Sequence, residues 1–63
     1  MKNNNLLEQL AIKYMMEHKF EHREIETYYV GNIQYFRVSF WTACVVYKEF
    51  NGTLEALVSK LQK

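Results

Sequence analysis

The sequence contains neither proline nor aspartate, and it has only two glycines and one cysteine. A single cysteine cannot form an intramolecular disulfide, so the chain does not fit the class of small secreted domains that disulfides hold together. Without aspartate the usual calcium and magnesium loops are absent, and two isolated glycines cannot form a glycine-rich phosphate loop. The composition therefore excludes several common kinds of ligand site.

Long apolar runs and an excess of charge of one sign are also missing. The most apolar stretch, residues 38–47, is much shorter than a membrane-spanning helix, which needs about 20 residues. Eight basic and seven acidic side chains give a net charge of +1. The molecule as a whole therefore has no electrostatic attraction to nucleic acid or to an anionic membrane. We expect a cytoplasmic protein with no membrane segment.

Apolar side chains, in contrast, are abundant. Hydrophobic residues make up 49% of the chain and aromatic residues 16%, which argues against intrinsic disorder. The 63 residues leave room for one domain, residues 1–63, in which about 60% of the unfolded chain's surface is buried. We therefore expect a single small domain whose stability depends on each large side chain.

Two segments have apolar residues at the spacing of one helical face. The first follows Asn4 or Asn5, either of which can serve as N-cap, and its apolar face comprises Leu6, Leu7, Leu10, Ala11, Tyr14, Met15 and His18. The second follows Thr53, a suitable N-cap, and its apolar face comprises Leu54, Leu57, Val58 and Leu61. Each pattern predicts an amphipathic helix, one near each end of the sequence.

Residues 24–30 and 33–40 alternate between apolar and polar side chains, which predicts two strands. The intervening Gly31 and Asn32 favour a two-residue hairpin turn, because both residues tolerate a positive φ. This turn fixes the register. It pairs Tyr28 with Tyr35 and Glu26 with Arg37 on one face, and both kinds of pair stabilise antiparallel sheets. The alternation, the turn residues and the cross-strand pairs therefore all predict the same hairpin.

Residues 44–50 predict a third strand, because Val45, Val46 and Tyr47 favour extended structure. Cys44 is expected at its start as a small buried hydrophobe. One register would place Arg37 opposite Lys48, which like-charge repulsion disfavours. The pattern does not select among the remaining registers.

Together these elements predict an α+β domain of order α-β-β-β-α. Its three strands form an antiparallel meander, and both amphipathic helices cover one sheet face. That face is expected to carry Ile25, Thr27, Tyr29, Phe36, Val38 and Phe40. The opposite face would carry Tyr28, Tyr35, Arg37 and Trp41.

The uncovered face is the first candidate contact surface. Aromatic side chains near Arg37 could stack on the bases of single-stranded nucleic acid, and Tyr, Trp and Arg are also enriched in protein interfaces. A third interpretation is that the aromatic pairs only stabilise an exposed sheet. Nearby carboxylates weaken the nucleic-acid interpretation; they belong to Glu24, Glu26 and Glu49.

A second candidate surface is an apolar stripe on the polar side of the first helix. Ile12 and Met16 lie there, and Phe20 would join them if the helix continued for one more turn. An exposed apolar stripe often marks an interaction site, which here could be a homodimer contact. The alternative is that residues 19–23 fold back over the stripe.

Residues 18–22 read HKFEH, which matches the H-x-x-E-H pattern of inverted zinc proteases. Two histidines four residues apart on a helix can share a metal ion, but this chain is too short to build the cleft of such an enzyme. A solvated helix end with histidines at its negative pole explains the same residues. We expect no catalytic site, no bound metal and no cofactor.

The element order and the residues LLEQLA at 6–11 resemble the double-stranded RNA-binding domain and its first helix. The resemblance implies phosphate binding by lysines that open the second helix. Residues 51–55, NGTLE, contain no lysine, and the turn at Gly31 is shorter than that family's first hairpin loop. The chain also resembles, in size alone, accessory inhibitors of phages and mobile elements such as anti-CRISPR proteins.

These observations predict a non-catalytic protein-binding module, acting as a small regulator or inhibitor. Its partner would be another protein or a second copy of the chain. The alternative is a nucleic-acid-binding domain that uses the aromatic sheet face.

Overall fold

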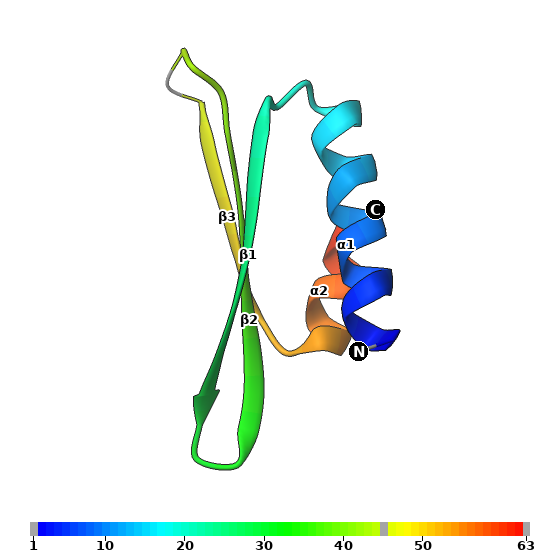
Figure 1. Cartoon of the computed structure of the whole chain (residues 1–63), viewed down its shortest axis with the longest axis vertical. Helices are drawn as coiled ribbons and strands as arrows, with labels where there is room; N and C mark the ends of the chain where they lie inside the picture. Colours follow the sequence, from blue (N-terminus) through cyan, green and yellow to red (C-terminus); the bar gives the residue numbers. More distant parts are fainter. Residues whose placement is uncertain (1, 45, 63) are drawn as a thin grey trace.

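The predicted α+β architecture is confirmed in the computed structural model, which describes residues 2–44 and 46–62. Within these residues the elements are α1 (Lys2–Glu17), β1 (His22–Val30), β2 (Ile33–Trp41), β3 (Tyr47–Gly52) and α2 (Leu54–Leu61). The strands form one antiparallel sheet in the order β1-β2-β3. Both helices lie against the same side of this sheet, which leaves its other side uncovered (Figure 1).

The β1–β2 hairpin has the predicted turn and register. Val30 lies opposite Ile33, and the two diagnostic pairs, Tyr28 with Tyr35 and Glu26 with Arg37, form as expected. Gly31 has φ 63°, the left-handed conformation that a two-residue hairpin turn requires. The hairpin is also longer than predicted, because β1 begins at His22 and β2 ends at Trp41.

The third strand differs from its prediction. It begins at Tyr47 rather than Cys44, because Ala43 and Cys44 lie in a turn. In this turn the Cys44 amide donates to the Thr42 hydroxyl (3.2 Å), and the Thr42 amide donates to the Val46 carbonyl (3.0 Å). Cys44 is therefore exposed, and its prediction as a buried strand residue is wrong. Val45, which was also predicted in this strand, lies outside the described residues.

The register of β3 pairs Arg37 with Asn51, Ser39 with Glu49 and Trp41 with Tyr47. Lys48 lies opposite Phe40, so the unfavourable Arg37–Lys48 pairing does not occur. Each of these β3 residues therefore shares a sheet face with its β2 partner.

Helix α1 begins at Lys2, so the predicted N-cap at Asn4 or Asn5 is wrong, and both residues lie inside the helix. Helix α2 begins as predicted, because the Thr53 hydroxyl accepts a hydrogen bond from the amide of Ala56 (3.4 Å). A first-turn Glu55 and a last-turn Lys60 complement the dipole of α2.

The end of α1 determines the path of the chain toward the sheet. Lys19 adopts φ 61°, and the amides of Lys19 and Phe20 donate to the carbonyls of Met16 (3.3 Å) and Met15 (2.9 Å). This is the hydrogen-bond pattern of a Schellman motif, with Lys19 in the position usually taken by glycine. The motif turns Phe20 back onto the core, where its ring stacks on that of Tyr14 at 6.3 Å.

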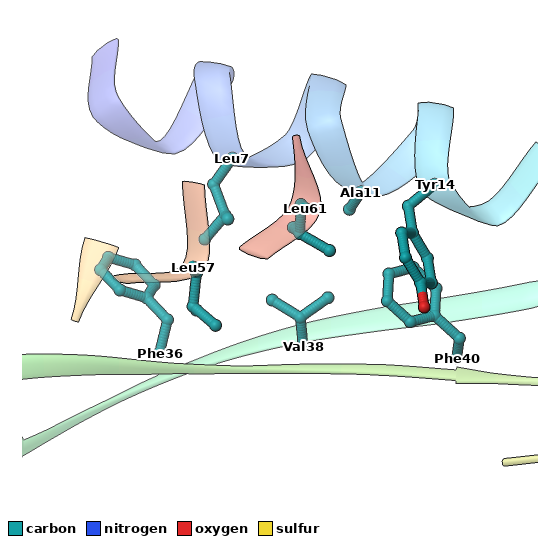
Figure 2. Close-up of a cluster of buried hydrophobic side chains, with 8 residues drawn as sticks. All are labelled: Leu7, Ala11, Tyr14, Phe36, Val38, Phe40, Leu57 and Leu61. Atoms are coloured by element: carbon teal, nitrogen blue, oxygen red, sulfur yellow. The ribbon is translucent and has the colours of Figure 1, made fainter. Parts of the chain in front are cut away.

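The core lies between the helices and β2 (Figure 2). Its buried side chains come from three elements: Leu7, Ala11 and Tyr14 of α1, Phe36, Val38 and Phe40 of β2, and Leu57 and Leu61 of α2. Thr27 and Tyr29 lie on this face as predicted, but their side chains are exposed. Tyr29 lies near the turn, at the closed end of the hairpin, and this end extends beyond both described helices (Figure 1).

Candidate functional site

The sheet side without helices, here called the open face, is the candidate site. Because paired residues of adjacent strands share a face, the register assigns its members. They are His22, Glu24, Glu26, Tyr28 and Val30 of β1, Ile33, Tyr35, Arg37, Ser39 and Trp41 of β2, and Tyr47, Glu49 and Asn51 of β3. The residues predicted for the uncovered face therefore do lie together on it: Tyr28, Tyr35, Arg37 and Trp41.

Aromatic side chains occur at both ends of the open face. Near the hairpin turn, the rings of Tyr28 and Tyr35 stack with centroids 5.7 Å apart and planes inclined by 17°. At the other end, the His22 and Trp41 rings stack at 5.6 Å. Tyr47 lies beside Trp41 on the neighbouring strand and exposes 60% of its surface. The open face thus carries aromatic side chains at each end and polar or charged side chains between them.

The only arginine of the open face is held by a carboxylate of the same face. Arg37 Nε donates to Glu26 Oε1 (2.9 Å), and its Nη2 contacts the same oxygen. This hydrogen bond and the negative charge of Glu26 raise the pKa of the Arg37 guanidinium, with a smaller contribution from the charge of Glu49. Arg37 is therefore partly neutralised by its neighbours.

Glu49 is kept ionised by two neighbours on its own strand. Its two carboxylate oxygens accept hydrogen bonds from the Tyr47 hydroxyl (2.6 Å) and the Asn51 amide (2.8 Å). These hydrogen bonds lower the pKa of Glu49 below the ordinary range of a carboxyl group. Glu49 is therefore negatively charged at neutral pH. Three glutamates, Glu24, Glu26 and Glu49, outnumber one arginine among the residues assigned to the open face, so this face is acidic.

A shallow depression occupies the end of the open face near Trp41. Its lining residues are Glu24, Ser39, Trp41, Thr42, Val46 and Tyr47. Ser39 lies between the outer strands and exposes only 9% of its surface. A second depression lies beside the ion pair and is lined by Glu26, Thr27, Tyr28 and Arg37.

The predicted apolar stripe on α1 is not continuous. Met16 exposes 69% of its surface and Ile12 is half-buried. Phe20 does not join them, because α1 ends at Glu17 and the Phe20 ring packs on Phe40 at 5.5 Å. The stripe is thus reduced to two residues.

The two histidines of the protease-like pattern lie on different structural elements. His18 stacks on Tyr14 at 3.9 Å, next to the end of α1, whereas His22 begins β1 and stacks on Trp41. The helical spacing that would let both hold one metal ion is therefore absent. In the described part of the chain, no three side chains of the types His, Cys, Asp and Glu group in a way that could hold a metal ion.

Sequence analysis missed Ser39 and Tyr47 as members of the site. Tyr47 is placed by the pairing of β2 with β3, and the turn between these strands contains no glycine or asparagine that would have fixed the register. Ser39 could have been placed from the predicted hairpin register, which puts it opposite Glu24. The Tyr47-Glu49-Asn51 alternation was visible in the sequence, but it could be aligned with β2 only after the start of β3 was known.

No protein-family model, no curated protein and no solved structure matches this chain. None of the described helices is long and apolar enough to cross a membrane.

Proposed function

We propose that the chain is a non-catalytic protein-binding module that uses the open face as its contact surface. The observation that supports this best is the one-sided placement of the helices, which leaves an aromatic sheet face uncovered (Figure 1). Exposed apolar area of this kind tends to mark an interaction site, and Tyr and Trp are enriched in protein interfaces. A domain this small would act by occupying a surface of its partner, as a regulator or an inhibitor does.

The charge of the open face favours a protein partner over nucleic acid. A binder of single strands combines stacking aromatic side chains with a basic groove that follows the phosphates. Here the aromatic side chains are present, but Arg37 is paired with Glu26, and Glu24 and Glu49 add further negative charge. Phosphates would be repelled from the surface that the bases would have to approach.

Affinity capture from the native host, with two matched variants, tests the proposal. Tyr47→Ala removes an exposed ring from the open face, and Tyr29→Ala removes a ring that is 66% exposed on the opposite sheet face. We expect a partner that the wild-type chain and Tyr29→Ala retain and that Tyr47→Ala loses or binds more weakly. A partner retained equally by both variants would contradict the assignment of the open face.

A fluorescence titration with single-stranded RNA and DNA at physiological salt tests the alternative. We expect no binding. If the alternative were correct, Tyr35→Ala would weaken binding by about 1–3 kcal/mol, and affinity would fall as salt is added. Micromolar or tighter binding with these properties would replace the proposed function.

A further inference from the structure

We infer that the outer edge of β1 pairs with the same edge of a second copy of the chain, so that two copies join their sheets across a two-fold axis at Thr27. This inference goes beyond the proposed function, because it concerns an edge of the sheet and not the open face. Its support comes from the length and composition of the edge strand, from the self-pairing that its charges allow and from the position of the helices.

The outer side of β1 offers backbone groups for pairing. The described sheet has the order β1-β2-β3, so β1 is one of its edges. A two-residue turn closes with a hydrogen-bonded pair, here Val30 and Ile33, and such pairs then occur at every second position of the hairpin. The amide and carbonyl groups of the intervening β1 residues therefore point outward; these residues include Ile25, Thr27 and Tyr29.

β1 lacks several features that usually protect an edge strand from pairing. Natural edge strands are often very short, or they carry lysine or proline. The other edge strand, β3, has six residues and contains Lys48, whereas β1 has nine residues and contains neither lysine nor proline. Every β1 residue from Glu26 to Val30 is exposed. The edge is thus long and open enough to take another strand.

The charges of β1 exclude most symmetric registers. When the strand pairs with its own copy, the two-fold axis passes through one residue, which then lies opposite itself. An axis at Glu24 or Glu26 would place two carboxylates directly opposite each other, and an axis at Ile25 would do the same by pairing Glu24 with Glu26. An axis at Arg23 would oppose two guanidinium groups. The axis must therefore lie nearer the turn.

An axis at Thr27 brings no like charges directly opposite each other. It pairs Thr27 with its own copy and Ile25 with Tyr29, and both kinds of pair stabilise antiparallel sheets. The carboxylate nearest the axis belongs to Glu26, which is already ion-paired with Arg37. An axis one residue nearer the turn would pair a shorter segment. Thr27 is therefore the position that gives the longest pairing without charge repulsion.

The helices leave room for a second copy at this position. Thr27 and Tyr29 lie on the helix side of the sheet, yet both are exposed, so α1 does not cover the edge at the axis. The closed end of the hairpin extends beyond both described helices (Figure 1). In the pair, this end of each copy lies beside the part of the other β1 where Ile25 packs against the core. The pairing would thus cover Tyr29, which exposes 66% of its surface in the single chain.

Two measurements on the wild-type chain test the pairing. One strand pair is a small interface, so sedimentation equilibrium from micromolar to millimolar concentration should show a reversible monomer–dimer equilibrium without larger species. In amide exchange measured by NMR, the outward amides of Thr27 and Tyr29 should exchange more slowly as the concentration rises. The amide of Gln34 points toward the opposite edge of the hairpin, beyond the last β2–β3 pair, and should not change. A monomer over the whole range, or equal changes at all three amides, would overturn the inference.

A charge swap at Thr27 tests the position of the axis. Thr27→Lys and Thr27→Glu each place like charges opposite each other, so each should weaken self-association about tenfold, whereas an equimolar mixture of the two should recover it. Gln34→Lys adds the same charge to another exposed residue on the helix side of the hairpin and should leave the dimer intact. Circular dichroism checks that each variant is folded.

The outcome also separates the edge from the open face. Self-association that is unchanged in Thr27→Lys, or a mixture that associates no better than either variant alone, would overturn the inference. Self-association that Tyr47→Ala abolishes and Thr27→Lys retains would place the contact on the open face and would refute the pairing of β1.

Discussion

Phe20 tests the path of the chain after α1 most directly. In the sequence this residue continues a stripe of exposed side chains, whereas in the structure it packs inward on Tyr14 and Phe40. Replacing Phe20 with alanine should therefore destabilise the domain. Replacing Met16, an exposed residue in the last turn of α1, should not destabilise the domain.

The magnitude follows from the burial of the ring. Replacing a fully buried phenylalanine with alanine costs about 3–5 kcal/mol. Phe20 is only half-buried, so we expect a loss of about 2–3 kcal/mol, which includes aromatic contacts of about 0.5–1.5 kcal/mol each. At about 0.05–0.15 kcal/mol per residue, the whole domain has about 3–9 kcal/mol of stability. The substitution would thus remove a large part of it.

Urea unfolding followed by far-ultraviolet circular dichroism measures the effect, with Met16→Ala as the control. Met16 lies four residues earlier and is mostly exposed, so its loss should change the free energy of unfolding by no more than about 0.5 kcal/mol. In a thermal melt, the expected loss at Phe20 lowers the midpoint by about 8–24 °C. If Phe20→Ala were as stable as wild type, the inward path of the chain at Lys19 would be refuted.

Three further substitutions test local features of the fold. Lys19→Gly should raise the free energy of unfolding by about 0.5–1 kcal/mol, because glycine relieves the left-handed backbone; a decrease in urea unfolding would contradict the Schellman ending. Thr53→Ala should cost about 0.5–1 kcal/mol through loss of the N-cap of α2, whereas Thr53→Asp should keep most of the stability, as thermal melts can show. The pKa of Glu49 is lower in the folded chain than in the unfolded chain. Its contribution to stability is therefore present above the ordinary carboxyl pKa of about 4.3, and it disappears as pH falls through the pKa of the folded state. Glu49→Gln should therefore flatten the acid limb of stability against pH, and an unchanged limb would contradict its hydrogen bonds.

The hairpin could be predicted completely because several independent signals agree. The alternation has a period of two, Gly31 meets the conformational need of a minimal turn, and the resulting register pairs Glu26 with Arg37. A slip of one residue would have mixed apolar and polar side chains on both faces. No comparable set of signals precedes β3, where the turn at Thr42 is formed by hydrogen bonds to a hydroxyl and a backbone carbonyl.

The end of α1 shows a second limit of the sequence pattern. Glycine is the usual signal for a left-handed helix ending, and this chain uses Lys19 there instead. Nothing in the local sequence therefore separates a continuing helix, with Phe20 beside Met16, from a turn that sends the ring inward. Tertiary packing of Phe20 on Phe40 decides between them. The same turn takes Phe20 away from the predicted contact stripe, of which Ile12 and Met16 remain on α1.

The projecting end of the hairpin has a consequence for how the molecule opens. Around Tyr29 and Ile33 neither sheet face is covered by a helix, and both side chains are largely exposed (Figure 1). Backbone hydrogen bonds that lack such cover break in local fluctuations, well below the free energy of global unfolding. Amide hydrogens in this part of the hairpin should therefore exchange with solvent earlier than those around Val38, which the core protects. Strand separation would begin at the turn and stop where the helices begin, so the two ends of one hairpin belong to different cooperative units.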